Sequence, residues 1–582
     1  MEKEKLEMFR HSMAHILAKA LKEIYGDKLK LTIGPAIDTG FYYDVDCEVP
    51  ITPNDFEKIE NKMKETLKRQ EDFRRVEVSK KEALKIFKDN EYKCEILNGL
   101  KDDEVVTIYY TGDDFFDLCR GPHVENTKFL LNFSFEIDKV AGAYWRGNEK
   151  NKMLQRIYCF GFENKQDLKE HKKFLQEAQE RDHRKLGKEL GIFMFSDLVG
   201  KGLPMWLPNG FILRRTLCDY IVDKELSYGY KHVLTPCIGT SNLYKTSGHW
   251  AHYKDDMFPP MKMDNEEFVL RPMNCPHHMM MFKNDLHSYK DLPLRIAEIG
   301  NVFRFEDSGT LLGIERVRNF YQNDSHIFCR PDQIKEVVGE VLKLILDVYK
   351  DFGFEKYYLR LSLREKGSDK YFDNDELWDK SENELRELLK ESGAEFCEAK
   401  GEAAFYGPKI DVQVYSALGH EITLSTCQLD YQLPEKFGLE YVGEDNEKHT
   451  PVVIHRAVFG SIDRFIAFLI EEYKGLLPMW LSPKQVYVLP IIDKCNDYAK
   501  MVLQKLKDNG IRADIDLRNE TIGKKIREAT AQKVPYCLII GEKEMNEQTV
   551  AIRKRKVGDM GAVKLDEFIK IAKNEIENKI RD

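Results

Sequence analysis

The chain has no long apolar run and no closely spaced pair of cysteines. Its longest apolar-looking stretch, residues 452–470, is interrupted by two arginines, a histidine and an aspartate, so it cannot span a bilayer as a helix. The first five residues, Met1-Glu-Lys-Glu-Lys, contain none of the apolar core of a secretory signal. The 12 cysteines include no Cys-x-x-Cys pair, which favours reduced thiols over a disulfide framework. We therefore expect a cytoplasmic protein that does not contact a membrane.

Glycine and proline are also scarce. They supply 36 and 20 of the 582 residues, too few for a fibrous repeat or a disordered chain. Apolar residues make up 42% and charged residues 32%, which is typical of a globular protein. At about 150 residues per domain, the length predicts roughly four domains. The length therefore excludes a single small binding domain.

Charge is distributed unevenly along the chain. The net charge of −9 argues against a nucleic-acid binder that relies on charge alone. From Lys484 onward, however, there are 21 basic and 16 acidic side chains, so this part carries +5 and the rest of the chain −14. A basic module on an acidic body suits an enzyme that docks a polyanion at one end. A solvated lysine-rich surface explains the same charge equally well.

Shifts in pattern divide the chain into four segments. Residues 1–164 combine short strands with a helix of regular apolar period, which predicts an α+β domain. Residues 165–188 are almost entirely charged and predict a solvent-exposed connecting helix. Residues 189–481 mix strands and helices, and residues 482–582 alternate apolar strands with helices as an α/β domain does. We expect an α+β multidomain protein.

The most polar strand pattern lies in the third segment. Residues 299–306 and 315–326 predict a β-hairpin with a long tip that contains glycines. Because side chains alternate along a strand, polar groups would gather on one face of each strand. These groups are Arg316, Arg318, Gln322, Asp324 and His326 on the second strand, and Arg304 and Glu306 on the first. Guanidinium groups bind phosphate bidentately, so this face predicts a binding site for a multiply charged ligand. The alternative is an exposed sheet face whose side chains form salt bridges of no functional importance.

Several motifs resemble those of class II aminoacyl-tRNA synthetases. The segment Phe303-Arg-Phe-Glu306 with the downstream Arg316 resembles their second signature motif, and Gly460-Ser-Ile-Asp-Arg464-Phe is similar to the third. The helix from about Phe211 and the strand that ends at Pro236 are similar to the first, dimer-forming motif. The resemblance implies an antiparallel-sheet catalytic domain and a homodimer.

Within this class the chain is most similar to threonyl-tRNA synthetases of the bacterial type, from about His11 to Ile571. The shared motifs are Ser247-Gly-His249-Trp, Arg271-Pro-Met-Asn-Cys275-Pro-His-His, Phe405-Tyr406-Gly-Pro-Lys409-Ile-Asp411, Gln428-Leu-Asp and His455-Arg-Ala. The resemblance implies that the chain activates threonine with ATP, as threonyl-adenylate, and transfers it to tRNA(Thr).

The resemblance also implies an ATP site. Arg304 would hold the α-phosphate and Glu306 the adenine amino group. Arg316 and Arg464 would hold the outer phosphates, with Mg²⁺ bridging them. Such a clamp stabilises the charge that grows as a carboxylate attacks phosphorus.

One zinc ion per subunit is implied at Cys275, His326 and His455. These residues lie 51 and 129 positions apart, so spacing alone does not group them. Without the resemblance they indicate a buried thiol and two hydrogen-bonded histidines. Three protein ligands leave zinc an open position, which threonine can fill through its amino group and hydroxyl. Valine has no hydroxyl and would be rejected strongly.

Further residues would complete the threonine pocket. Asp324 would accept a hydrogen bond from the substrate hydroxyl, and His249 would lie near the terminal ribose of the tRNA as a proton acceptor. The pocket would also be lined by Gln322, Tyr406, Lys409 and Gln428. The implied catalytic residues are Arg304, Arg464, His249, Gln428 and Lys409.

Serine carries the same two groups as threonine, and one missing methyl costs only about 1–3 kcal/mol, roughly 10- to 200-fold. A second, hydrolytic site is therefore expected in the first segment. Its candidate residues are His11, His15, Lys93, Asp117, Cys119 and His123. The two His/Cys pairs have the spacing of a zinc quartet, as in the related alanyl enzymes, and a helix-face histidine pair of unrelated function is a further alternative. The family resemblance implies metal-free hydrolysis of seryl-tRNA(Thr), so we expect no metal there.

The final segment resembles a class IIa anticodon-binding domain. The motifs are Asp516-Leu-Arg518, residues 522–529 and Lys533-Val-Pro-Tyr536. Glu544 and Arg553 match the positions that read anticodon bases, with Arg555 nearby. Acidic and guanidinium groups suit hydrogen bonding to unstacked base edges, although each residue taken singly is an ordinary surface charge.

The chain also departs from the family pattern. About ten residues precede His11, where the family usually carries a ubiquitin-like domain, so we expect that domain to be missing. We expect tRNA charging to survive without it. The tip sequence Leu311-Leu-Gly-Ile-Glu315 departs from the family and predicts weaker contacts there with ATP or the acceptor stem. Tyr321 and Thr423 are further variations, and none of these changes removes a metal ligand or a phosphate arginine.

Three alternative functions remain open. One is an editing-dominated paralogue with weak synthesis, and another is a metal-dependent hydrolase that depends only on the His/Cys pairs. The third is a non-catalytic RNA-binding regulator, which predicts loss of the phosphate arginines that this chain retains.

Overall fold

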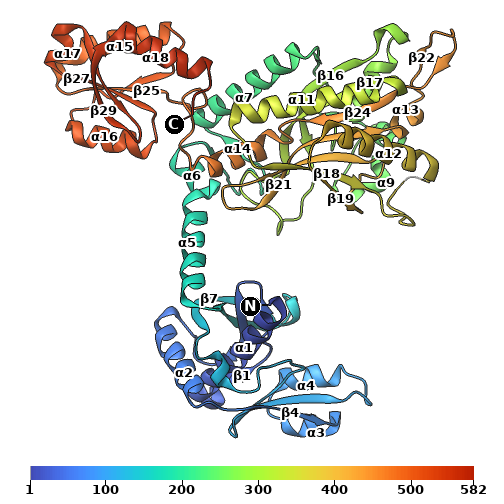
Figure 1. Ribbon diagram of the computed structural model, residues 1–582, viewed down its shortest axis with the longest axis vertical. Helices are drawn as coiled ribbons and strands as arrows, with labels where there is room; N and C mark the ends of the chain where they lie inside the picture. Colours follow the sequence, from blue (N-terminus) through green and yellow to red (C-terminus); the bar gives the residue numbers. More distant parts are fainter. Residues whose placement is uncertain (1, 372, 582) are drawn as a thin grey trace. The chain divides into compact units, whose positions relative to one another are not determined.

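The computed structural model describes residues 2–371 and 373–581 (Figure 1). The chain separates into two compact units, Met1–Gln176 and Glu177–Asp582. Among the described residues, no helix is both long and apolar enough to span a membrane.

The first unit is built on one long helix that packs against a sheet. Helix α1 (Lys3–Tyr25) buries the apolar side chains that recur at helical spacing, among them Met13, Leu17 and Leu21. They share a core with a five-stranded sheet of order β1-β3-β8-β7, in which β2 pairs with β3. The strands are β1 (Leu29–Leu31), β2 (Ala36–Ile37), β3 (Gly40–Cys47), β7 (Ser134–Tyr144) and β8 (Met153–Phe162).

A second, three-stranded antiparallel sheet of order β4-β5-β6 completes this unit. Its strands are β4 (Phe73–Val78), β5 (Val106–Thr111) and β6 (Phe115–Leu118). The remaining helices are α2 (Phe56–Lys68), α3 (Lys80–Ile86) and α4 (Glu91–Asn98). Helix α4 carries Lys93 and strand β6 carries Asp117, so the hydrolytic candidates come from three different elements.

The charged segment after this unit forms two helices where the sequence predicted one. Helix α5 (Lys165–Arg181) buries no residue, as its charge predicts. Helix α6 (His183–Glu189) begins anew because the Asp182 side chain accepts a hydrogen bond from the backbone N–H of Arg184 at 2.7 Å. The second helix is not solvent-exposed throughout, since it buries His183 and Leu186.

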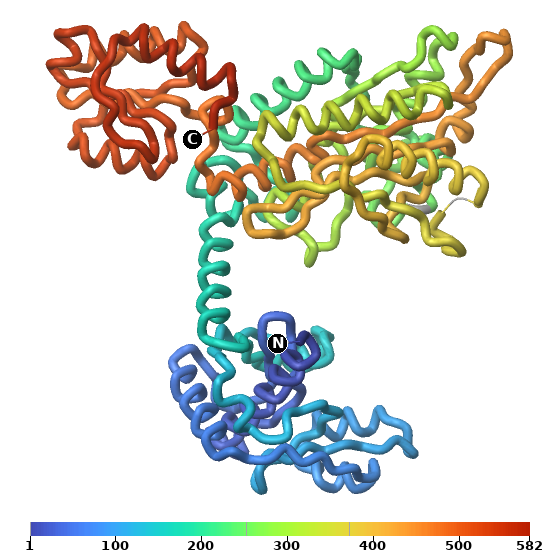
Figure 2. The backbone as a smooth tube through the Cα atoms, in the orientation of Figure 1, coloured from blue at the N-terminus to red at the C-terminus, as the bar shows by residue number. Residues whose placement is uncertain are grey.

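An eight-stranded, mainly antiparallel sheet organises the second unit (Figure 1). Its order is β11-β16-β17-β24-β21-β20-β18-β19, so strands far apart in the sequence, such as β17 and β24, run side by side (Figure 2). The strands are β11 (Lys231–His232), β16 (Leu294–Phe303), β17 (Asn319–Cys329), β18 (Tyr357–Leu363), β19 (Phe396–Lys400), β20 (Lys409–Tyr415), β21 (Glu421–Asp430) and β24 (Val452–Ala457). The antiparallel catalytic sheet that the sequence predicted is confirmed.

Several helices share the apolar core of this sheet, among them α7 (Pro208–Ser227), α11 (Ile334–Phe352) and α14 (Ile462–Glu472). Further helices are α8 (Ser241–Ser247), α9 (His249–His252), α10 (Cys275–Lys283), α12 (Asp375–Ser392) and α13 (Gln432–Phe437). Short strands are β9 (Phe193–Met194), β10 (Met205–Trp206), β12 (Ile238–Thr240), β13 (Met261–Met263), β14 (Glu266–Leu270), β15 (His287–Ser288), β22 (Tyr441–Val442) and β23 (Lys448–His449).

The last hundred residues form the α/β domain that the sequence predicted. Its sheet has the order β26-β25-β27-β28-β29, with the first three strands parallel and the last two antiparallel. The elements are β25 (Val486–Pro490), α15 (Asn496–Asp508), β26 (Ala513–Ile515), α16 (Ile522–Ala531), β27 (Tyr536–Ile540), α17 (Glu542–Glu547), β28 (Thr549–Lys554), β29 (Gly558–Lys564) and α18 (Leu565–Glu577). Strand β29 was not predicted from the sequence, because it contains two glycines and no run of apolar side chains.

Candidate active site

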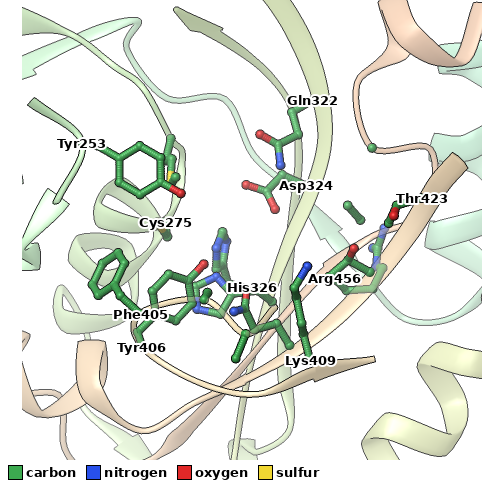
Figure 3. Close-up of a pocket in the computed structure, with 18 of the residues that line it drawn as sticks. Tyr253, Cys275, Gln322, Asp324, His326, Phe405, Tyr406, Lys409, Thr423 and Arg456 are labelled. Carbon is green, nitrogen blue, oxygen red and sulfur yellow. The ribbon is translucent and has the colours of Figure 1, made fainter. Parts of the chain in front are cut away.

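A cavity of about 720 Å³ opens on the eight-stranded sheet (Figure 3). Ten residues that the sequence singled out line it: Cys275, Arg304, Gln322, Asp324, His326, Tyr406, Lys409, Gln428, His455 and Arg464. They come from strands β17, β20, β21 and β24, from the start of α10 and α14, and from the loops between them. Neither composition nor spacing could have brought them together, because the strands that carry them pair out of sequence order.

Strand register explains why four of these side chains meet. The sheet pairs His326 with His455, His455 with Gln428, and Gln428 with Lys409 across neighbouring antiparallel strands. Residues directly opposite each other point to the same face of a sheet. Along β17, Gln322 and Asp324 share this face with His326, as strand alternation predicts, and they project into the cavity (Figure 3).

Cys275, His326 and His455 form a compact group of metal-binding side chains. One donor atom from each lies within 4.8 Å of the others, and all three residues are buried. The Nε2 of His326 is buried without a hydrogen-bond partner, while the Nε2 of His455 donates to Asp430 at 2.8 Å and leaves its Nδ1 available. One thiol and two imidazoles fit zinc with an open coordination position.

The acidic residue beside this group is Asp324. Its carboxylate accepts a hydrogen bond from the side-chain amide of Asn274 at 3.0 Å, and burial raises its pKa. Its other oxygen accepts a hydrogen bond from the backbone N–H of Ser325 at 3.0 Å. Because each carboxylate oxygen has two lone pairs, Asp324 can accept a further hydrogen bond from a hydroxyl in the cavity that it lines.

The arginines divide into two groups. Arg304 and Arg464 line the cavity, whereas Arg316 does not and instead pairs with Glu306 at 2.9 Å. The predicted strand face is therefore wrong at its outer end, because β16 stops at Phe303 and β17 starts at Asn319. Arg304, Glu306, Arg316 and Arg318 accordingly belong to the hairpin tip and not to the strands. The tip is held in other ways, since the backbone N–H of Arg318 donates to Gly202 at 2.7 Å.

His249 lies behind the cavity wall. Its side chain is fully buried, and it is not among the residues that line the cavity. Its Nε2 lies 3.0 Å from the sulfur of Met273 and 3.6 Å from the sulfur of Cys275. The structure places the imidazole of His249 next to Cys275, a thiol of the candidate metal-binding group. The role of His249 as a proton acceptor stays a prediction.

Several polar residues of the cavity were not identified as site residues from the sequence: Tyr253, Asp256, Lys370, Thr426 and Arg456. Thr423, noted from the sequence only as a departure from the family pattern, also lines the cavity. Arg456 is fixed by an ion pair with the buried Glu225. Lys409 is anchored by Asp411, whose carboxylate lies 2.8 Å away. Arg456 belongs to the motif His455-Arg-Ala that the sequence shares with the family. Its ion pair with the buried Glu225, however, is seen only in the structure.

A second cluster lies in the first unit. His11, His15, Cys119 and His123 place one donor atom each within 4.8 Å of one another. The sulfur of Cys119 lies 3.3 Å from Nε2 of His11 and 3.1 Å from Nε2 of His123. Burial lowers the pKa of all three histidines and raises the pKa of Cys119 to about 11. The imidazoles are therefore neutral near pH 7.

Lys93 and Asp117 form a buried ion pair in the same unit. Their charged atoms lie 2.6 Å apart, and each side chain is at most 3% exposed. The hydroxyl of Tyr43 donates to the other oxygen of Asp117. Tyr43 comes from β3 and was not identified from the sequence, because an apolar strand residue gives no sign of a polar partner.

The anticodon candidates lie in the last domain. Glu544 is on α17 and accepts a hydrogen bond from the backbone N–H of Gly541 at 2.9 Å. Arg553 is exposed on β28. Arg555 donates to the backbone carbonyls of Lys533 and Leu477 at 2.7 and 2.8 Å, so it is engaged within the protein.

The sheet and its cavity define the class of protein. Residues 258–473 match the family model described as "tRNA synthetase class II core domain (G, H, P, S and T)", so this part of the second unit is a class II aminoacyl-tRNA synthetase core. Residues 485–575 match "Anticodon binding domain", and residues 106–158 match "Threonyl and Alanyl tRNA synthetase second additional domain".

Full-length relatives identify the family. The threonine–tRNA ligases of Staphylococcus carnosus and Anoxybacillus flavithermus are each 55% identical over 97% of this chain and over 87% and 88% of their own lengths. The chain belongs to the threonine–tRNA ligase family. The solved RNA-binding domain of threonyl-tRNA synthetase from Cryptosporidium parvum has a TM-score of 0.65 and 39% identity, covering 68% of this chain and 98% of that one. The resemblance and the fold class inferred from the sequence are confirmed.

Proposed function

We propose that the chain joins threonine to tRNA(Thr) through threonyl-adenylate, at the cost of ATP. The observation that carries the proposal is the cavity where a thiol, two imidazoles and the buried Asp324 lie close to two arginines. In this proposal residues 1–164 are the editing domain, 165–188 connect it, 189–481 are the catalytic domain and 482–582 bind the anticodon.

Zinc is proposed as the resident metal, held by Cys275, His326 and His455. When bound, it would ligate both the amino and the hydroxyl group of threonine, by expanding its shell beyond four ligands. Asp324 accepts the hydrogen bond of that hydroxyl, and Gln322, Tyr406 and Gln428 line the rest of the pocket. Valine would leave Asp324 without its hydrogen bond, and sites of this kind reject such analogues by about 10⁴- to 10⁵-fold.

ATP is proposed to bind beside the amino acid with Mg²⁺. Arg304 holds the α-phosphate, Arg464 and Arg316 the outer phosphates, and Glu306 receives the adenine amino group. Before ATP binds, Arg316 pairs with Glu306 at 2.9 Å and does not line the cavity, so its side chain must turn to reach a phosphate. The carboxylate of threonine attacks the α-phosphorus and pyrophosphate leaves, while the guanidinium groups stabilise the growing negative charge. A ribose hydroxyl of the tRNA then attacks the threonyl carbonyl and AMP leaves, with Lys409 and Gln428 positioning the reactants.

The protein is proposed to act in the cytoplasm as a homodimer. Phe211, on the helix that resembles the dimer-forming motif, is 55% exposed, which supports burial by a second copy. Glu544 and Arg553 are proposed to contact unstacked anticodon bases.

This account is tested by pyrophosphate exchange and by tRNA charging. Wild-type protein should exchange label between pyrophosphate and ATP when threonine is added, more weakly with serine, and should charge tRNA(Thr). An editing-dominated paralogue would show little exchange, and a non-catalytic RNA-binding protein would show none.

Editing is proposed to be metal-free. A neutral imidazole close to Cys119 takes a proton from water as the water attacks the seryl carbonyl. The bond to the ribose oxygen breaks, the proton passes to that oxygen, and free serine and the tRNA hydroxyl are released. The ion pair of Lys93 and Asp117 holds the site together.

Changing His11 to alanine should leave charging with threonine intact and let seryl-tRNA(Thr) accumulate. Synthesis alone distinguishes serine only by about 10- to 200-fold, so loss of hydrolysis becomes visible. The measurement is the yield of acid-stable seryl-tRNA(Thr), with the exposed His449→Ala variant as control. Unchanged seryl-tRNA levels in the His11 variant would contradict the assignment.

A further inference from the structure

A chain of buried hydrogen bonds leads away from His326. Its Nδ1 lies 2.7 Å from Nδ1 of His278, and the rings meet edge to face at a centroid distance of 4.7 Å. The other ring nitrogen of His278, Nε2, lies 3.1 Å from a carboxylate oxygen of Glu298. Both histidines and Glu298 are at most 1% exposed, so water does not compete for these contacts.

Glu298 is held as a carboxylate by donors on both of its oxygens. Arg271 donates to Oε1 at 3.1 Å, as does the backbone N–H of Thr235 at the same distance. The hydroxyl of Thr235 donates to Oε2 at 2.7 Å. A carboxylate surrounded by donors can only accept a hydrogen bond from His278.

This arrangement fixes the position of each proton. Because Glu298 only accepts, Nε2 of His278 must carry hydrogen. In a neutral imidazole the other nitrogen then accepts, so Nδ1 of His326 must be the donor. That leaves Nε2 of His326 with a free lone pair, and this atom is the one that is buried without a partner beside Cys275 and His455.

We propose that Arg271, Glu298 and His278 form a relay that holds His326 in the tautomer and orientation needed to bind the metal. The proposal depends on the zinc site proposed above. His455 receives the same support directly, since its Nε2 donates to Asp430 at 2.8 Å. Both histidines thus obtain a carboxylate partner, one directly and one through a second imidazole. Partners of this kind orient metal ligands and raise their basicity.

The relay is tested by the zinc affinity of the purified full-length protein, measured by competition with a chromogenic chelator. His278→Ala removes the acceptor for Nδ1 of His326 and should weaken zinc binding by about 10- to 100-fold. His278→Asn can restore an acceptor oxygen at that position and should recover much of the affinity. The neighbouring His277→Ala is the matched control, because His277 lies on the same helix and contacts neither His326 nor Glu298 through any hydrogen bond in the described residues.

A second variant keeps the shape of the cluster. In Glu298→Gln the side-chain amide would donate to Nε2 of His278, which turns Nδ1 of His278 into a donor and makes Nδ1 of His326 the acceptor. The proton on His326 then moves to Nε2, where metal must bind, so this isosteric change should also weaken zinc by about 10-fold or more. Circular dichroism melting verifies that each variant is folded.

The outcomes separate the relay from the function on which it depends. Wild-type protein that binds zinc, with His278→Ala and Glu298→Gln binding it equally well, overturns the relay and leaves the metal site standing. Wild-type protein that binds no zinc overturns both. Weakened binding in both variants and unchanged binding in His277→Ala supports the relay.

Discussion

Replacing His326 with alanine should remove zinc from the protein and reduce threonine-dependent pyrophosphate exchange by on the order of 10⁴-fold. An effect of this size is expected when a site built to bind a substrate hydroxyl loses the group that binds it. His326 is one of the three side chains that form the candidate metal-binding group of the cavity. Its loss leaves a thiol and one imidazole, too few to keep a catalytic zinc ion. Exchange kinetics and metal analysis of the same preparation provide the measurement.

The control for this variant is His449→Ala. His449 is a partly exposed histidine that pairs with Asp445 outside the cavity. It should retain one zinc per chain and full exchange. Zinc loss without loss of threonine exchange in the His326 variant would show that the metal does not recognise the substrate.

Replacing Arg304 with alanine should lower the rate of exchange by about 10²- to 10³-fold, the cost of removing one group that stabilises charge in a transition state. Arg304 lines the cavity and is poorly fixed by the protein itself, since its Nε lies 3.4 Å from the carbonyl of Pro272. Its guanidinium is therefore available to a phosphate. Zinc content should not change, which separates this effect from that of His326.

A matched control exists on the preceding strand. Arg295 lies on β16 but pairs with Glu340 and does not line the cavity. Arg295→Ala should exchange at nearly the wild-type rate, and Arg304→Lys should fall between alanine and wild type, because lysine keeps the charge but not the bidentate fork. An Arg304→Ala variant within twofold of wild type would remove Arg304 from the phosphate site.

The elements with strong local patterns could be predicted from the sequence alone. Helix α1 follows the apolar period of residues such as Met13 and Leu17, and α15 is one of the helices that alternate with strands in residues 482–582, as predicted. Alternation on one strand also placed Gln322, Asp324 and His326 on a common face. In each case the signal is local, because it depends on residues that are neighbours along the chain.

Other features depend on pairing between distant segments and could not be derived from composition or spacing. His326 and His455 meet because β17 pairs with β24, although the intervening chain contains four other strands of the same sheet. Only the family resemblance grouped them with Cys275. The buried partners Glu298 and Tyr43 gave no sequence signal, since an acidic or aromatic residue on a strand does not reveal what lies opposite.

The hairpin tip shows the limit of strand alternation. Alternation assumed that the strands extend to Glu306 and Glu315, but they stop at Phe303 and Asn319. The tip arginines are consequently oriented by loop contacts, such as the pair of Arg316 with Glu306.

The central claim is that one zinc ion binds threonine through its hydroxyl and amino groups. Zinc X-ray absorption spectra of the wild-type protein test it most directly, recorded alone, with threonine and with valine. We predict one sulfur and two imidazole nitrogens from the protein, a change in the remaining ligands on addition of threonine, and no change with valine. A protein without zinc, or one whose zinc spectrum is unaffected by saturating threonine, would contradict the account.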